Sequence, residues 1–186
     1  VSTDSRQIAA IAMRYGAEAP FLRPAALARD DTPGILPILH AVRWLAEHEH
    51  YEPTHVMVLQ PTSPLRTVED IERPVRLALE KKADGVVSVC PATPHPYWVK
   101  TMTADGRLSD FLHVKGSSFR RQDLPPAFQL NGAVYLVTRE VLLRRRTCYT
   151  ERTFAYLMPR ERSLDIDSAW DLHLADLLLR SSRNVR

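Results

Sequence analysis

Cysteine is scarce in this 186-residue chain, and the two that it contains, Cys90 and Cys148, lie far apart without histidines at ligand spacing. There is no C-x-x-C pair, so the sequence indicates neither a zinc site nor a disulfide framework. A chain without disulfides fits a reducing compartment, and we therefore expect a cytoplasmic protein.

Long apolar runs and large basic clusters are missing as well. No stretch approaches the roughly 20 apolar residues of a membrane-spanning helix, and we expect no signal peptide. The 25 Lys and Arg exceed the 22 Asp and Glu by only three, and the basic clusters at 120–121 and 144–146 lack interleaved aromatic residues. This pattern argues against nucleic acid as a partner and agrees with a small anionic substrate. We expect a soluble protein that binds no membrane.

The composition is that of a globular protein, with 45% hydrophobic and 25% charged residues. A chain of this length fits one domain, which buries roughly 70% of the surface that its unfolded chain exposes. Its first residues, Val1-Ser-Thr-Asp, are typical of the end of a strand whose beginning is missing, and they include no initiator Met. We therefore expect an N-terminally incomplete domain.

Helical spacing begins at three points in the first half of the chain and once near its end. Asp4 or Ser5 caps the first of these helices, and the next two begin near Thr32 and Thr67. Pro74 is expected to kink or interrupt the third. Apolar stripes that should face the core are formed in the first helix by Ile8, Ile11, Ala12 and Tyr15, and in the last by Trp170, Leu174, Leu177 and Leu178.

Four short apolar runs alternate with these helices and are typical of buried strands: HVMVLQ, GVVSVC, NGAVYLV and TFAYLMP. This alternation indicates an α/β domain, whose ligands bind at the carboxyl ends of the strands. About 40 residues between the second and third runs break the pattern, and they contain a predicted hairpin over 98–103 with a turn at Asp105-Gly106. We expect the segment 94–130 to form a lid, a dimerisation arm, or both.

The segment ERSLDIDSAWDL places Asp165 and Asp167 one residue apart in front of the last helix. In an extended stretch both carboxylates point to one side, where a Mg²⁺ ion would offset their repulsion. Alternatively, Asp167 or Ser168 caps the helix and Asp171 completes a capping box. Both interpretations remain open from this segment alone, although capping leaves one aspartate without a role.

Two further stretches carry candidate binding residues. In LQPTSPLR, which ends an expected strand, Gln60 is suited to bind hydroxyl groups and Arg66 an anion or a carboxylate, while a rigid turn is the alternative. In FRRQDLPPAFQLNG, the adjacent Arg120 and Arg121 could clamp a carboxylate, while an ordinary salt-bridged arm is the alternative. His95 lies between two prolines and is interpreted as a structural residue.

In this order, the stretches VSTD, RPAALARDDT, LQPTSPLRT, HPYW, RRQDLP, NGAVYL and ERSLDIDSAWDL resemble the CMP-sialic acid synthetases, also called N-acylneuraminate cytidylyltransferases. The resemblance covers essentially the whole chain. It implies one Rossmann-like nucleotidyltransferase domain over 1–186, a three-layer α/β/α fold with a mostly parallel sheet and an inserted dimerisation arm at 94–130. It also implies an enzyme that joins CTP to the anomeric hydroxyl of a nonulosonic acid, a 2-keto sugar acid, and releases pyrophosphate. The homodimer is implied as well.

The resemblance also assigns roles to positions that match the family's motifs. Asp165 and Asp167 match its Mg²⁺-binding and catalytic pair, and Arg23 with Asp30 fall in its nucleotide-base loop. Positions assigned to the sugar are Gln60, Asn131 and Tyr135, with Lys100 and Tyr149 in a looser alignment, and Arg121, which in the family reaches the partner's site from the arm.

The chain departs from the family at two places. The family's glycine-rich basic segment, which cradles the triphosphate, is absent because the chain starts beyond it, so activity is expected to depend on that segment. Gly34 stands where relatives commonly carry Ser or Thr. A relative without turnover, which only binds ligands or a partner, is therefore the alternative function. A phosphatase with Asp165 as nucleophile is disfavoured because RERS, and not an apolar strand, precedes Leu164. The sequence leaves N-acetylneuraminic, legionaminic and pseudaminic acid open as substrates.

Overall fold

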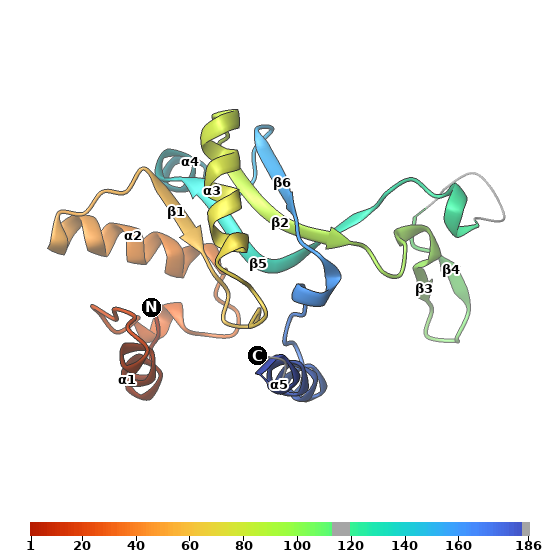
Figure 1. The fold of residues 1–186 in the computed structure, drawn as a ribbon, viewed down its shortest axis with the longest axis horizontal. Helices are drawn as coiled ribbons and strands as arrows, with labels where there is room; N and C mark the ends of the chain where they lie inside the picture. The colour runs from red at the N-terminus through yellow and green to blue at the C-terminus, as the bar shows by residue number, and fades with distance from the viewer. Residues whose placement is uncertain (113–119, 184–186) are drawn as a thin grey trace.

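A four-stranded sheet in the order β1-β5-β2-β6 forms the centre of the structure, a computed structural model that describes residues 1–112 and 120–183 (Figure 1). The strands span His55–Val58 (β1), Gly85–Pro91 (β2), Phe128–Thr138 (β5) and Thr153–Leu157 (β6). β6 lies parallel to β2, while β5 runs antiparallel to both β1 and β2. Three of the four strands therefore point the same way, although only β2 and β6 are paired in parallel. The four predicted strands are confirmed, in a mixed sheet whose strands mostly share one direction.

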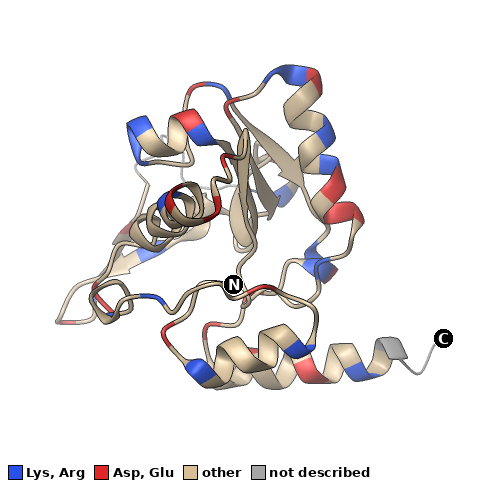
Figure 2. Ribbon diagram, turned by 90° about the vertical axis from the view of Figure 1, so that its left-hand side faces the viewer, with Lys and Arg blue, Asp and Glu red and all other residues tan. Residues whose placement is uncertain are grey.

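Helices cover both faces of this sheet, as Figure 2 shows from the side. α3 (Glu69–Lys81) packs on one face, where Ala78 meets Val86 and Leu136. α2 (Ile35–Glu49) and α4 (Arg139–Arg145) pack on the other face, in a core that includes Leu39, Val137 and Leu142. The predicted three-layer α/β/α arrangement is confirmed. No described helix is long and apolar enough to cross a membrane.

α3 begins where the sequence predicts and is stabilised by local charges. The carboxylate of Asp70 accepts hydrogen bonds from the N–H and the hydroxyl of Thr67, and Glu69–Arg73 and Glu72–Arg76 form ion pairs one turn apart. The helix continues through Pro74, so the predicted interruption is wrong. Pro74 lies in the second turn, where its missing N–H deprives a single carbonyl of its helical partner, and its ring is buried against the body.

The first and last helices differ from expectation in what they bury. α1 (Arg6–Arg14) is capped by Ser5, as predicted, but Ile8 is 53% and Tyr15 89% exposed. In α5 (Ala169–Arg183) Trp170 is 71% exposed. The predicted apolar stripes of both helices are therefore largely exposed, and only Ala12 and Leu174 among their residues are half-buried.

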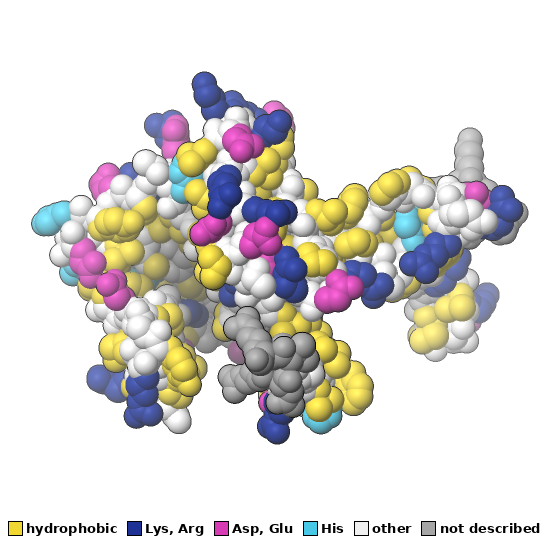
Figure 3. Space-filling model, viewed as in Figure 1, with side chains coloured by type: hydrophobic (Ala, Val, Ile, Leu, Met, Phe, Trp, Pro, Cys, Tyr) yellow, Lys and Arg dark blue, Asp and Glu magenta, His cyan; other side chains and the backbone are white. Residues whose placement is uncertain are grey.

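The predicted arm projects from the end of the β2–β5 pair. It contains the antiparallel hairpin of β3 (Lys100–Met102) and β4 (Leu108–Asp110), which confirms the predicted hairpin, while residues 113–119 lie outside the described part. β5 already begins at Phe128, so the last three residues of the predicted segment belong to the sheet. The space-filling view shows apolar side chains along the neck between sheet and arm (Figure 3).

Candidate active site

A break in the strand pairing shapes the site. Val87 pairs with Tyr135, but Val89, two residues on, pairs with Leu130, so residues 131–134 of β5 bulge out of the ladder. A bulge re-aims backbone and side chains at the place where it occurs. Here it lies beside the loops that follow β1 and β6, which carry the predicted residues Gln60 and Asp165.

Buried hydrogen bonds of Ser88 and Asn131 stabilise the bulge. The hydroxyl of Ser88 donates to Oδ1 of Asn131 at 2.6 Å and accepts the N–H of Val134 at 2.8 Å. The amide nitrogen of Asn131 donates to the hydroxyl of Ser163 at 2.9 Å, and the residue is only 3% exposed. The structure thus gives Asn131 a supporting place beneath the site, and its contact with a sugar stays a prediction.

Gly132 is the point at which two predicted residues converge. Its φ of +72° is a conformation that favours glycine. A Cβ at this position would lie 2.6 Å from Oε1 of Gln60 and 3.0 Å from Oδ2 of Asp165. The missing side chain therefore makes room for the amide of Gln60 and the carboxylate of Asp165 against the backbone of β5. No role was predicted for Gly132, although a glycine after Asn131 in a strand is a signal for a bulge.

The capping alternative for the two aspartates is decided by the hydrogen bonds before α5. Ser168 and Asp171 form the capping box: the carboxylate of Asp171 accepts from the N–H and hydroxyl of Ser168, and the N–H of Asp171 donates back to that hydroxyl. The side chains of Asp165 and Asp167 take no part in the cap. Helix capping therefore does not account for either of them.

The carboxylate of Asp165 has an unmet requirement for a partner. Its Oδ1 is buried and has no hydrogen-bond partner among the described residues, and such an orphaned buried acceptor is costly. Asp167, two residues on, is exposed. No group of three His, Cys, Asp or Glu side chains comes together in the described chain. Two carboxylates fit Mg²⁺, which commonly takes one or two of them and completes its shell with water and substrate phosphate.

Backbone hydrogen bonds tie the loops of the site together. The N–H of Ile166 donates to the carbonyl of Thr62 at 2.9 Å, which joins the loop after β6 to the loop after β1. The guanidinium of Arg66 donates to the carbonyls of Gln60 and Ala133. Arg66 was predicted to bind an anion or a carboxylate, and in the structure its guanidinium joins a carbonyl of the loop after β1 to one of the bulge.

Tyr135 and Tyr149 lie together near these loops, with ring centroids 6.5 Å apart and planes at 86°. Burial, followed by the neighbouring Tyr135, raises the pKa of Tyr149 to about 12. Burial also raises the pKa of Tyr135, and the charge of Asp165 adds to this effect. Both hydroxyls therefore remain protonated at neutral pH, and because they are hydrogen-bonded to each other, one of them keeps its hydrogen for a ligand.

The predicted nucleotide residues lie in the N-terminal segment. The Nε of Arg23 donates to the hydroxyl of Ser2 at 3.1 Å, and its Nη2 also donates to the Ser2 carbonyl. Asp30 is exposed in the turn after the short helix Ala25–Leu27. The structure thus fixes Arg23 against the chain near its start, and no contact of either residue with Asp165 or Gln60 is present among the described interactions.

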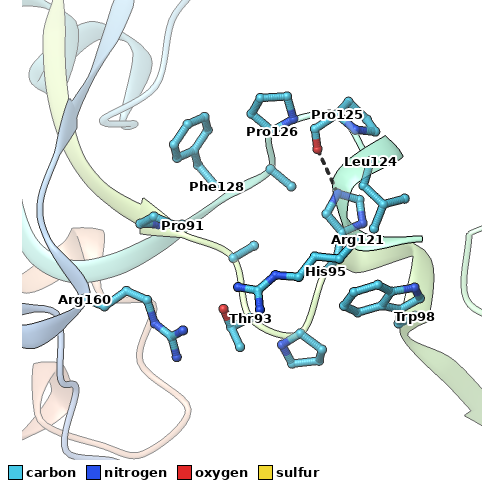
Figure 4. A pocket seen from close by; sticks show the side chains of 13 residues that line it. Pro91, Thr93, His95, Trp98, Arg121, Leu124, Pro125, Pro126, Phe128 and Arg160 are labelled. Carbon is cyan, nitrogen blue, oxygen red and sulfur yellow. Dashed lines mark hydrogen bonds between the residues drawn. The ribbon is translucent and has the colours of Figure 1, made fainter. Parts of the chain in front are cut away.

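The predicted arm residues are separate from this cluster. Lys100 on β3 forms an ion pair with Asp110 on β4 and stays on the hairpin. Arg121 lines a cavity of about 530 Å³ between arm and body, together with Arg160 (Figure 4). The other walls are largely apolar and include Pro91, Pro94, Trp98, Leu124, Pro125, Pro126 and Phe128. Within residues 1–112 and 120–183, neither guanidinium has a hydrogen-bond or ion-pair partner.

The carboxylate of Asp70 is buried near the site, and the sequence predicted for it only a role at the start of a helix. Asp70 is 0% exposed and, besides the two bonds from Thr67, accepts bonds from Tyr156 and from Arg162. Burial acts to raise its pKa, but these hydrogen bonds, led by that of Arg162, outweigh burial and hold the pKa of Asp70 well below its usual range. Only its spacing from Thr67 was visible in the sequence, since Arg162 is 92 residues away.

Comparison with known proteins gives relatives over the whole chain. It is 33% identical over 192 residues to the CMP-N,N'-diacetyllegionaminic acid synthase of Legionella pneumophila, covering all of this chain and 79% of the relative. It is also 33% identical to the N-acylneuraminate cytidylyltransferase of Escherichia coli O18:K1:H7, covering 94% of this chain and 40% of that protein. No family model matches.

A solved structure supports the fold independently. CMP:2-keto-3-deoxy-manno-octonic acid synthetase, complexed with CTP, superposes with a TM-score of 0.66 at 12% sequence identity, covering 98% of this chain and 80% of that one. Identity this low speaks for the nucleotidyltransferase fold alone. The identity to the Legionella enzyme over most of its length decides the family, and the chain belongs to the CMP-sialic acid synthetases, the N-acylneuraminate cytidylyltransferases.

Proposed function

We propose that this protein transfers CMP from CTP to the anomeric hydroxyl of a nonulosonic acid and releases pyrophosphate. The observation that carries the proposal is the carboxylate of Asp165, which lies against Gly132 beside the amide of Gln60 with one buried oxygen unpartnered among the described residues. It lies in the loop after β6, where α/β sheets bind ligands. The named activities of the relatives agree with this reaction.

Asp165 and Asp167 would hold Mg²⁺, which when bound offsets the charge that develops on the phosphoryl oxygens. The protein contributes preorganisation, because the loop that carries Asp165 is already tied to the loop after β1 by the Ile166–Thr62 hydrogen bond. Gln60, which lies beside that carboxylate at Gly132, is proposed to orient hydroxyl groups. Arg23 and Asp30 are proposed for the cytosine side of the nucleotide.

For the sugar acid we propose hydrogen bonds with the paired hydroxyls of Tyr135 and Tyr149, which stay protonated. Arg121 is suited to the carboxylate, because its guanidinium is unpaired in the described chain and faces a cavity with apolar walls. Lys100 and Asn131 complete the proposed set. Apolar walls favour a substrate with acyl substituents, as in the acids on which the named relatives act.

A homodimer that assembles through the arm is proposed as the working state. The hairpin of β3 and β4 stands away from the sheet, and every residue of its two strands is exposed. A segment with no core of its own gains stability by pairing with another copy. Light scattering at micromolar concentration should give twice the monomer mass, and a monomer would contradict the proposal. Both cysteines are free and buried, which supports a cytoplasmic location.

CTP with Mg²⁺ should raise the melting temperature of the full-length protein by more than ATP, GTP or UTP does. A ligand that binds only the native state stabilises it by mass action, by about 2.7 kcal/mol at a hundred times its Kd. Thermal shift with the four nucleotides at one concentration measures this. Equal shifts would contradict the cytidylyl assignment. A shift with CTP but no pyrophosphate on adding sugar acids would favour the alternative, a relative that binds without turnover.

A further inference from the structure

The ion pair between Asp70 and Arg162 joins two elements that are far apart in sequence. Both oxygens of Asp70 are engaged by Arg162, from Nε at 2.8 Å and from Nη2 at 2.8 Å. The hydroxyl of Tyr156 donates to the same carboxylate at 2.9 Å. Asp70 lies on α3, whereas Arg162 ends the short helix Arg160–Arg162 that leads from β6 to Asp165. The pair therefore connects α3 to the loop that carries the proposed metal ligands.

Three contacts fix this loop on either side of Asp165. The first is the ion pair at Arg162, and the second is the hydrogen bond from the Asn131 amide to Ser163. The third is the bond from the Ile166 N–H to the carbonyl of Thr62. Asp165 lies between the second and third contacts, and its own Oδ1 has no described partner. Its orientation is thus imposed by neighbours and not by a bond from that oxygen.

Helix capping explains only part of the Asp70 environment. The two bonds from Thr67 are local and would form in any helix that begins with this pattern. The bonds from Tyr156 and Arg162 come from residues 86 and 92 positions later. A buried ion pair is poor evidence for stability, since its desolvation offsets most of the attraction, and apolar replacements are often neutral. Such a pair is better explained by what it holds in place.

We infer that Asp70 and Arg162 are positioning residues that set the loop of Asp165 for metal binding, which deepens the proposed function and rests on it. The bidentate geometry fixes the direction of the Arg162 side chain, and so the point from which the loop 163–167 departs. Neither residue belongs to the set proposed to bind the substrates. Their effect on the reaction passes through Asp165.

The test is a neutral replacement of both residues, Asp70→Asn with Arg162→Met. The new amide can accept from Thr67 through its oxygen and donate to the Tyr156 hydroxyl through its nitrogen, and no charge is left buried. The melting temperature should therefore stay within about 4 °C of the parent. The amide of Ile166 should exchange its hydrogen at least about tenfold faster while the β5 amides are unchanged. Affinity for Mn²⁺, used as the probe of the metal site, and kcat should each fall about tenfold or more, the usual loss when a group that orients a metal ligand is removed.

A matched control is available on the same helix. Glu72 and Arg76 form an exposed ion pair at 2.6 Å, and replacing both by Gln should change neither Ile166 exchange nor Mn²⁺ affinity. If the neutral pair fails to fold, Arg162→Lys takes its place as the test. Lys keeps the charge without the bidentate geometry, so the Ile166 amide of this variant should exchange faster than in the parent. Unchanged Ile166 exchange and Mn²⁺ affinity in a folded neutral variant would overturn the inference. Absent turnover in the parent and the control would overturn the proposed reaction instead, while the exchange measurement still decides the positioning role.

Discussion

Replacing Asp165 or Asp167 by Asn should lower the rate of pyrophosphate release at saturating CTP and Mg²⁺ at least about a hundredfold. This is the usual loss of rate when a preorganised electrostatic contact to the transition state is removed. Asn keeps the shape of the side chain but removes one negative charge. Stability should stay the same or rise, because Oδ1 of Asp165 is buried without a described partner and Asp167 is exposed. Neither carboxylate caps α5, so no helix stability is lost with it.

Asp171→Asn is the control for this pair, since Asp171 belongs to the cap of α5 and not to the proposed metal site. It should lower the free energy of unfolding by up to about 1 kcal/mol and leave turnover nearly unchanged. Activity assays and urea unfolding of the three variants separate charge at the site from helix capping. Full turnover in both the Asp165 and Asp167 variants would refute the metal role.

Gly132→Ala should reduce turnover about a hundredfold, because the new methyl would occupy the place of the Gln60 amide and the Asp165 carboxylate. Both groups end flexible side chains, so they can move aside at small cost in stability. The backbone term remains, since a φ of +72° costs about 1 to 2 kcal/mol for a residue with a Cβ. The loss should therefore appear mainly in activity.

Gly106→Ala provides the matched comparison. Gly106 has a φ of +85° in the turn of the arm hairpin, and a Cβ there would meet nothing within 4 Å. The two variants should lose similar free energy of unfolding, and only Gly132→Ala should lose turnover. Equal activity of the two, measured with CTP and a nonulosonic acid, would show that the crowding at Gly132 has no bearing on the reaction.

The sequence was sufficient for those parts of the fold that local patterns determine. The four strands, the Ser5 cap and the hairpin turn at Gly106 each follow from a few adjacent residues, although β6 is largely exposed. The exposure of the first and last helices did not follow from the sequence. An apolar stripe shows which face of a helix can be buried, but it does not show which element covers that face. Pro74 does not interrupt α3, because only one carbonyl loses its helical partner and the proline ring is buried, which the sequence does not show.

The candidate site was predictable where a residue type itself suggests chemistry. Asp165 and Gln60 were chosen for their side chains, and the structure brings both to Gly132. The supporting contacts were not predictable, because they join residues that are distant in sequence: Ser88 with Asn131, and Asp70 with Arg162. The partner of Arg66 in the bulge of β5, the carbonyl of Ala133, is also distant in sequence. Without that partner in view, the sequence predicted that Arg66 binds an anion or a carboxylate.

Formation of a CMP-sugar is the most direct measure of the central claim. The full-length protein is incubated with CTP and Mg²⁺ and, in turn, with N-acetylneuraminic, legionaminic and pseudaminic acid. It should release one pyrophosphate for each CMP-sugar formed. Mass spectrometry of the products and a pyrophosphate assay on the same sample give both quantities. With one of the three acids the two should rise together and stop when EDTA is added. If none of the acids yields a CMP-sugar while CTP still stabilises the protein, the proposed transfer is contradicted.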